Sequence, residues 1–481
     1  MSILVRRSCA TLVALAVAGS LLVARAHAAD TPPPPLDKQL RAEIIDGTCA
    51  ELERTYVEAD TAKLIANVLR KKLKAGAYDR FTDRNEFAQA VTTDLRSLNG
   101  DLHLTLRPGG AGAHAGGPTI VIRGAPGPGG GAPVIAQGGA PPGGPVVERR
   151  VAGGPGGPGG AGGRPIPGMP DAREHNFGLE HAEILPGNIG YLEVTGFNEA
   201  EGMEDAMVGA LKFLERTDAM IIDVRRNGGG SGRMSHMLFS HFLPADSIPT
   251  IRVTSRATSE PTLMRSLVDV PGPRRPDVPL YVLTSRRTGS AAEEFSFVLH
   301  NLKRATLVGE RTAGAGHMVN FADVPHDFVL GVSITRVADP RTGLEWEAVG
   351  VPVDKAVDAD RALVVAQQEA LKLLASRATE PDRKRRLEWA ADWVTAGDRP
   401  QPVGETMSRL AGSFEQDREV AVQDGKLVYR RGTMSEVLRP LGDDRYMLTP
   451  EARIVFDTGT PAPGFAIERL DGSRTQVARR K

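Results

Sequence analysis

The spacing of apolar residues predicts helices near the N-terminus. Between residues 36 and 98, apolar residues recur at three- and four-residue intervals, which is the period of an amphipathic helix. Asp83 is placed to cap a third helix that begins at Asn85 and runs to Leu98. Because the connections between these helices are short, we expect a small helical bundle over residues 36–104.

Strand and helix patterns alternate over residues 178–375, which we take as the core of the protein. Continuous apolar runs bounded by turn residues predict buried strands, and amphipathic stretches predict helices. The predicted strands are 189–194, 219–224, 280–284 and 306–309, and the predicted helices are 201–216 and 291–302. This order predicts an α/β fold with a mostly parallel sheet.

The C-terminal part has a different pattern. Residues 376–403 are charged and helical in period, and we interpret them as a linker. From 404 to 481, short apolar runs alternate with turn residues, including Asp424-Gly425 and Asp471-Gly472. The pattern predicts a separate, small all-β domain.

Residues 109–170 explain the high Gly and Pro content of the chain. More than half of the residues in this stretch are Gly or Pro, and the few apolar ones show no sustained period. Such a segment buries too little apolar surface to offset the loss of backbone entropy. We therefore expect a flexible, disordered insertion.

The first 28 residues have the features of a signal peptide. Arg6 and Arg7 precede an apolar run, and Ala26-His27-Ala28 suits a signal peptidase. The apolar run is shorter than the roughly 20 residues that cross a bilayer. We expect cleavage after Ala28, export to the periplasm or the medium, and no stable membrane anchor afterwards. Cleavage removes Cys9 and leaves Cys49 alone, which excludes an intramolecular disulfide and a cysteine zinc site.

Charge and motifs exclude several classes of partner. Lys and Arg together number 59, and Asp and Glu together also number 59, so the net charge is zero. A nucleic-acid partner is therefore not expected. The glycine loop 227–230 lacks the Lys-Ser/Thr pair of a phosphate loop, so nucleotide binding is not expected either. We expect no cofactor and no metal.

Three places on the chain carry candidate chemistry. Ser290 follows a buried strand and begins a helix, which places its hydroxyl near the helix N–H groups, although Ser290 with Glu293 also fits a plain capping box. The glycines 228–230 allow the backbone to approach a ligand and present N–H groups to an oxyanion. Glu347, taken alone, is typical of a solvated surface carboxylate.

In order and spacing, four motifs resemble the tail-specific (C-terminal processing) serine peptidases, in the branch shared by tricorn protease and interphotoreceptor retinoid-binding protein. The motifs are residues 223–230, 288–293, 305–314 and 349–354. The resemblance covers about 36–104 and 178–375 and implies a crotonase/ClpP-like β/β/α core. No PDZ-like segment lies between bundle and core. The C-terminal domain resembles the lipocalin-like modules appended to exported bacterial hydrolases.

The resemblance also implies roles for single residues. Ser290 matches the nucleophile, Gly229 matches a glycine whose N–H helps to form the oxyanion hole, and the N–H of Ala291 is the second donor. One branch of the family uses a Lys base, but Ala315 stands at that position here.

The branch that resembles tricorn uses a His base and a Glu. His103 and Glu347 match those two positions, and an imidazole is a natural base near neutral pH. His317 is a competing base, because it follows the loop that lacks the Lys.

These residues predict an exported serine-type endopeptidase of Ser-His-Glu type. It would form an acyl-enzyme at Ser290 and cleave peptides or the tails of unfolded proteins. The alternative is a catalytically inactive protein that binds a peptide or an apolar ligand on the same fold. The sequence leaves the oligomeric state open.

Overall fold

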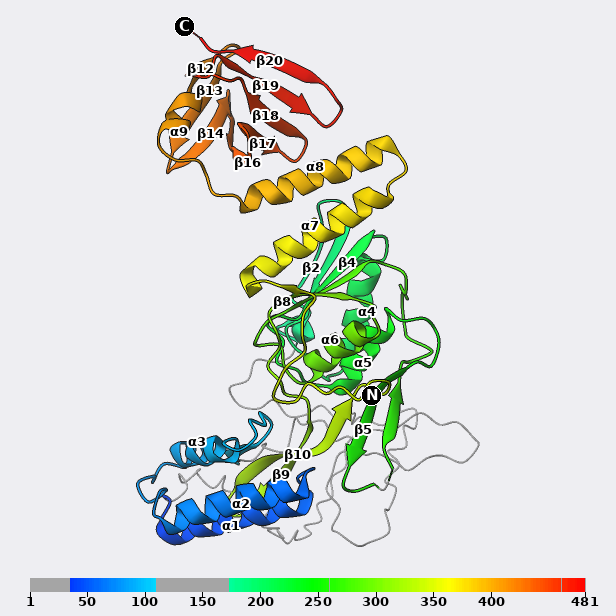
Figure 1. Cartoon of the computed structure of the whole chain (residues 1–481), viewed down its shortest axis with the longest axis vertical. Coiled ribbons are helices and arrows are strands. Elements are labelled where there is room, and N and C mark those ends of the chain that lie inside the picture. The colour runs from blue at the N-terminus through cyan, green and yellow to red at the C-terminus, as the bar shows by residue number, and fades with distance from the viewer. Residues whose placement is uncertain (1–34, 110–172, 259, 460, 481) are drawn as a thin grey trace, which may run out of the picture.

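The computed structural model describes residues 35–109, 173–258, 260–459 and 461–480. The predicted signal peptide and nearly all of the predicted Gly/Pro-rich insertion lie outside these residues. The molecule is elongated, with three N-terminal helices at one end, an α/β core in the middle and a β domain at the other end (Figure 1). None of the described helices combines the length and the apolar character needed to span a bilayer.

The core contains the predicted mostly parallel sheet. Its strand order is β11-β8-β7-β4-β3-β2, and every neighbouring pair is parallel except β3 and β2. The strands are β2 (His181–Leu185), β3 (Ile189–Glu193), β4 (Ala219–Asp223), β7 (Leu280–Thr284), β8 (Thr306–Gly309) and β11 (Lys355–Ala356). The parallel order is therefore confirmed.

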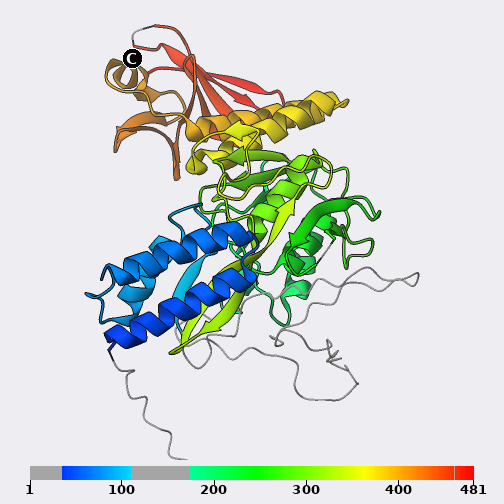
Figure 2. The same cartoon turned by 60° about the horizontal axis from the view of Figure 1, so that its bottom comes forward.

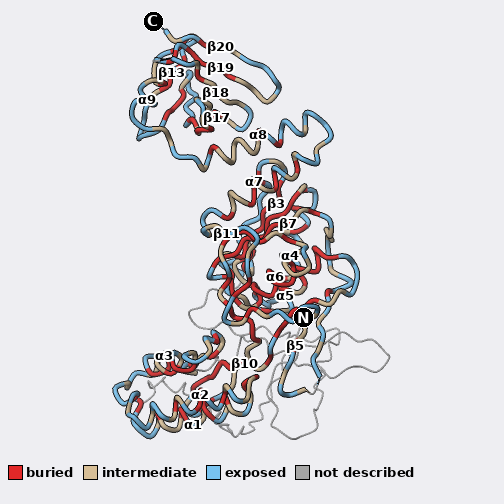
Figure 3. Tube along the Cα trace, viewed as in Figure 1, coloured by how far each residue is buried: buried red, intermediate tan, exposed pale blue. Residues whose placement is uncertain are grey.

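Helices cover both faces of this sheet. Successive side chains of a strand point to opposite faces. Met220 and Ile222 of β4 pack against one group of helices, and Ala219 and Ile221 pack against α7 on the other side. The first group is α4 (Met203–Phe213), α5 (Gly232–Ser240) and α6 (Ala291–Asn301), and α7 spans Ala359–Arg377. Figure 3 shows buried residues concentrated along the core strands between these layers.

A second, antiparallel sheet joins the N-terminal helices to the core. Its order is β1-β10-β5-β6, and β9 also pairs with β10. The strands are β1 (Thr105–Pro108), β5 (Pro249–Ser255), β6 (Thr262–Arg265), β9 (Met318–Val324) and β10 (Phe328–Ala338). Because β1 follows the helices directly and pairs with β10, the two parts of the chain share one sheet.

The three N-terminal helices form where the sequence predicts them, and they share their apolar core with strands of the second sheet. Helices α1 (Lys38–Thr55), α2 (Ala59–Lys74) and α3 (Arg84–Leu95) share an apolar cluster with β9 and β10, which includes Leu52, Phe87 and Phe328. Figures 1 and 2 show α1 and α2 side by side next to these strands. The sheet therefore completes the apolar core of the three helices.

The C-terminal region forms β structure, as predicted. In the part of the chain that the structure describes, two antiparallel sheets enclose one apolar cluster, with α9 (Glu405–Leu410) at its edge. Asp424-Gly425 forms the turn between β13 and β14. The strands are β12 (Gly412–Phe414), β13 (Arg418–Gln423), β14 (Lys426–Arg431), β15 (Met434–Val437), β16 (Arg439–Gly442), β17 (Arg445–Thr449), β18 (Ala452–Phe456), β19 (Gly464–Arg469) and β20 (Arg474–Ala478).

Helix α8 (Pro381–Asp398) lies between the core and the β domain. Its Leu387 packs with the residues of α7 that cover the core sheet. Its Trp389 and Ala396 pack with Leu441 and Met447 of the β domain. The segment interpreted from the sequence as a linker thus contains a helix with apolar contacts on both sides.

We predict that a chain ending after Asp398 keeps a folded core. The apolar cluster of the β domain is separate from those of the core, and α8 supplies the apolar contact between them. Truncation uncovers Trp389, so some loss of solubility is expected without loss of the core transition in thermal unfolding. Circular dichroism of the truncated and full-length chains checks this expectation. Loss of the cooperative core transition on truncation would show that the β domain is part of the core.

Candidate active site

Ser290 lies at a sharp turn between a buried strand and a helix. The chain leaves β7 at Thr284 and enters α6 at Ala291. Ser290 has φ +50° and ψ −120°, a conformation that costs a non-glycine residue free energy. Such strain is typical of functional turns, and the surrounding structure must impose it.

A buried carboxylate holds this turn. Glu293 is fully buried and accepts the backbone N–H of Ser290 at 2.9 Å. The same carboxylate accepts the N–H groups of Gly314 and Ala315 at 2.7 and 2.8 Å and the hydroxyl of Thr312 at 2.5 Å. Glu293 therefore supplies its half of the capping box and ties the Ser290 turn to the loop after β8. Ala315 contributes only its backbone N–H to this contact.

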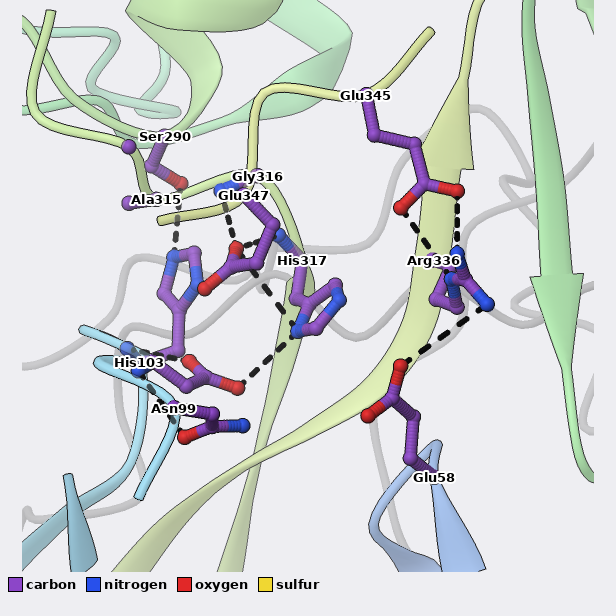
Figure 4. A network of polar contacts seen from close by, with 12 residues as sticks. Glu58, Asn99, His103, Ser290, Ala315, Gly316, His317, Arg336, Glu345 and Glu347 are labelled. Atoms are coloured by element: carbon purple, nitrogen blue, oxygen red, sulfur yellow. Dashed lines mark hydrogen bonds and ion pairs between the residues drawn. The ribbon is translucent and has the colours of Figure 1, made fainter. Parts of the chain in front are cut away.

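The hydroxyl of Ser290 faces His103. The distance between Ser290 Oγ and His103 Nε2 is 3.3 Å (Figure 4). His103 lies in the turn between α3 and β1, where Asp101 Oδ1 accepts its backbone N–H at 2.9 Å. Arg96 donates to the carbonyls of Leu102 and Leu104 on either side. The N-terminal part of the chain thus holds an imidazole over the serine of the core.

The surroundings of His103 favour its neutral form. Burial lowers the pKa of His103, and the neighbouring charge of Asp101 opposes that shift only in part. A neutral imidazole can accept the proton of a serine hydroxyl. Its other ring nitrogen, Nδ1, is buried and has no hydrogen-bond partner among the described residues.

Glu347 lies beside the imidazole of His103 (Figure 4). Its Oε2 accepts the N–H groups of Gly316 and His317 at 2.6 and 2.8 Å, whereas Oε1 is buried without a partner among the described residues. Polar atoms of Asp101, His103 and Glu347 lie within 4.8 Å of one another. Burial, followed by the charge of Asp101, raises the pKa of Glu347 to about 7. The free Oε1 and the free Nδ1 of His103 are natural partners for one hydrogen bond.

His317 does not reach the serine in this structure. Its side chain is 5% exposed, and its Nδ1 lies 3.1 Å from Asp101 Oδ2 and 3.8 Å from Glu347 Oε2. No contact with Ser290 is found for it among the described residues. The structure therefore places His103 in contact with Ser290, whereas His317 contacts the carboxylates of Asp101 and Glu347.

Asp101, His103 and Glu347, whose polar atoms lie within 4.8 Å of one another, are residue types that can bind a metal ion. His317 already faces both carboxylates, so we assign no metal.

The predicted oxyanion donors lie beside Ser290. Gly229 has φ +113°, and a Cβ there would come within 2.8 Å of Ser290 Cβ and 3.1 Å of Ala291 N. The Gly229 N–H, however, donates to Asn227 Oδ1 at 2.8 Å. Within the described residues, the Ala291 N–H makes no hydrogen bond. An oxyanion could take the Ala291 N–H directly and would have to displace Asn227 to take that of Gly229.

Three further residues of the site were not singled out from the sequence. Tyr56, at the end of α1, donates its hydroxyl to Asp101 Oδ2 at 3.0 Å, and Asn99 donates to Tyr56 at 2.7 Å. Burial raises the pKa of Tyr56, so its hydroxyl stays protonated and remains a donor. Asp101 lies two residues before His103 in the sequence, and its acidic side chain is a signal for this network.

Glu294, next to Glu293 on α6, gives a prediction about stability. It is 7% exposed, and its Oε1 has no partner among the described residues. Burial raises the pKa of Glu294 from about 4.5 to about 8. The folded protein therefore binds this proton more tightly than the unfolded chain does, and stability falls as pH rises from about 4.5 through about 8.

The substitution Glu294→Gln should remove this loss, because the amide cannot ionise. We expect the Tm of the variant to exceed that of the wild type by about 2–4 °C at pH 8.5 and to match it near pH 5. Differential scanning calorimetry at both pH values checks this. The exposed residue Glu201 provides a control, and Glu201→Gln should leave the Tm unchanged at both pH values. An equal effect of Glu294→Gln at both pH values would contradict the ionisation argument.

Comparison with known proteins identifies the core. Residues 188–357 match the model of peptidase family S41. The chain is 27% identical over 167 residues to carboxyl-terminal-processing peptidase 3 of Arabidopsis thaliana, covering 34% of this chain and 31% of that protein. It is 28% identical over 173 residues to the carboxyl-terminal-processing protease of Synechocystis, covering 36% and 38% of the two chains. The crystal structure of tricorn protease aligns with a TM-score of 0.34 at 16% identity, over 67% of this chain and 35% of that one.

The match to the S41 model and the two sequence relatives confirm the resemblance that the four motifs carry. The core contains a domain of peptidase family S41, and the relatives named above are carboxyl-terminal-processing peptidases. The chain spans about a third of the length of those relatives.

Proposed function

We propose that this protein is an exported serine peptidase that cleaves peptides or the tails of unfolded proteins. The S41 domain of its core is the basis of this proposal. The observation that carries the proposal is the 3.3 Å contact between His103 Nε2 and Ser290 Oγ at a strained turn. The relatives are named for carboxyl-terminal processing, which supports a protein tail as the substrate. The proposed export rests on the N-terminal signal pattern in the sequence.

The geometry supports acyl-enzyme chemistry. His103 Nε2 takes the proton of the Ser290 hydroxyl while Oγ bonds to the carbonyl carbon of the scissile peptide. The resulting oxyanion takes the N–H of Ala291, and that of Gly229 once Asn227 is displaced. His103 then gives its proton to the leaving amine, and the C–N bond breaks. A water molecule, deprotonated by His103, hydrolyses the ester and restores Ser290.

Glu347 is proposed to orient His103. Its free Oε1 and the free Nδ1 of the imidazole are both buried, so a hydrogen bond between them satisfies two otherwise unpaired groups. That bond fixes the tautomer in which Nε2 carries no proton and can act as the base. The domain therefore works as a Ser-His-Glu site, with no base from the side chain at position 315.

A binding function on the same fold is the alternative. It requires no base beside Ser290 and no strain at that residue. The retained contact between serine and imidazole, together with the strained turn, favours catalysis.

A fluorophosphonate probe tests the proposal. Such a probe forms a covalent bond with an activated serine, so we expect it to label the wild type and not Ser290→Ala. The exposed residue Ser247 provides the matched control, and Ser247→Ala should label like the wild type. Absence of labelling in the folded wild type would overturn the proposed function and favour the binding protein.

A further inference from the structure

His317 lies between two buried carboxylates that support the proposed base. Its Nδ1 is 3.1 Å from Asp101 Oδ2 and 3.8 Å from Glu347 Oε2, and its backbone N–H donates to Glu347 Oε2 at 2.8 Å (Figure 4). The side chain is 5% exposed, so water screens these interactions little.

Each carboxylate acts on a different part of His103. Asp101 Oδ1 accepts the backbone N–H of His103 and so holds the turn that carries it. Glu347 faces the imidazole and is its orienting partner in the proposed mechanism. His317 contacts the carboxylates of both Asp101 and Glu347. Among the described residues, it makes no hydrogen bond with Ser290 or with the imidazole of His103.

Two carboxylates this close do not both stay ionised without a cation. Polar atoms of Asp101 and Glu347 lie within 4.8 Å of each other, and both side chains are largely buried. Like charges in a shared, buried site force one group to keep its proton. Among the described residues, His317 is the group that ion-pairs with both of them.

We propose that His317 is a positioning residue of this site: as an imidazolium between Asp101 and Glu347, it favours the ionised forms of both carboxylates and thereby holds His103 over Ser290. The proposal rests on the proposed peptidase function. His317, the alternative base in the sequence analysis, thus positions the base instead of acting as one.

The groups that face His317 favour the imidazolium. Asp101 and Glu347 face it from the turn before β1 and from the loop after β10, and Glu58 adds attraction from the connection between α1 and α2. Burial lowers the pKa of His317, but the hydrogen bond to Asp101 and the three negative charges outweigh burial and raise it. Tyr56 presents a neutral ring edge-on, 6.5 Å between centroids.

His103 is the remaining titratable neighbour, and its neutral form adds no opposing charge. The hydrogen bond from His317 and its positive charge outweigh burial and lower the pKa of Asp101 to about 2. Glu347 has a pKa of about 7 even with His317 lowering it, so Glu347 is the carboxylate that gains a proton when the cation is removed.

The substitution His317→Gln tests the role, because it keeps a polar side chain and removes the charge. The acid limb of kcat/KM should move to higher pH by about one unit, since an opposite charge at this range shifts a carboxyl pKa by 1–3 units. At pH 7 the rate should fall about fivefold and recover in large part by pH 9. KM should change little, because His317 is proposed to act through His103 rather than on the substrate.

Two further variants separate charge from packing. Asp101→Asn added to His317→Gln removes the repulsion that protonates Glu347, and the new amide oxygen can still accept the His103 N–H. The acid limb of this double variant should return toward that of the wild type. His326, on the same β9–β10 hairpin, pairs with Glu43 away from the site, so His326→Gln should leave the pH profile unchanged.

A fall in rate for His317→Gln that is equal at every pH, with no return in the double variant, would overturn the proposal. The charge itself is measured without activity: in Ser290→Ala, the ring nitrogen NMR shifts of His317 should report an imidazolium at pH 7. A neutral ring at that pH would also overturn it. Failure of the wild type to label with a fluorophosphonate would instead overturn the peptidase function. The NMR measurement of the His317 charge does not depend on that outcome.

Discussion

The substitution Ser290→Ala is expected to lower the rate of peptide hydrolysis by roughly 10⁴–10⁶-fold, the largest effect of any change in this protein. Alanine keeps the Cβ and removes the hydroxyl, so no acyl-enzyme can form. The turn itself should persist, because Glu293 is held by the backbone N–H groups of residues 290, 314 and 315 rather than by the serine hydroxyl. Alanine also retains the N–H that Glu293 accepts.

The measurement is hydrolysis of a denatured protein substrate, followed by mass spectrometry of the products. Thermal unfolding of Ser290→Ala should match that of the wild type within about 1 °C, which shows that the loss is chemical. Ser247→Ala, an exposed substitution, should keep the full rate. If Ser290→Ala retains more than a few per cent of the wild-type rate, another residue is the nucleophile.

The four central strands of the parallel core, β3, β4, β7 and β8, were predictable because they are largely apolar runs. Leu280–Thr284 is buried throughout, and its limits agree with the prediction from sequence. The hairpin β9–β10 was not predicted, although it carries the N-terminal helices. Most residues of β9 are only partly buried, so they lack a strong apolar pattern. Pairing of β10 with Thr105–Pro108 joins segments that are remote along the chain, and local periodicity contains no information about such pairing.

The candidate site likewise contains residues that were predictable from the sequence and residues that were not. Ser290 was predictable from its place between a buried strand and a helix, and His103 and Glu347 followed from their match to family motifs. The network behind them was not predictable: His317 and Asp101 are 216 positions apart, and only the fold brings them together. The hydrogen bond from Gly229 to Asn227 is likewise a property of the folded loop. Residue types indicate which chemistry is available, and tertiary contacts decide which group performs it.

The second large effect is expected for His103→Ala, which should lower kcat by about 10²–10⁴-fold with little change in KM. The serine hydroxyl is a poor nucleophile without a base, and His103 Nε2 is the base within reach at 3.3 Å. Glu347→Gln should cost less, because Glu347 orients the imidazole and transfers no proton. Kinetics with a short peptide substrate separate kcat from KM.

The pH profile distinguishes a base from a packing residue. The imidazole must be neutral to accept a proton, so wild-type activity should fall below about pH 7, where first Glu347 and then His103 gain protons. In His103→Ala this acid limb should disappear, and added imidazole should restore part of the rate by filling the space of the missing ring. His181, an exposed histidine on β2, serves as the control, and His181→Ala should keep both rate and profile. A full rate in His103→Ala, together with an inactive His317→Ala that imidazole restores, would make His317 the base and refute the assignment of His103.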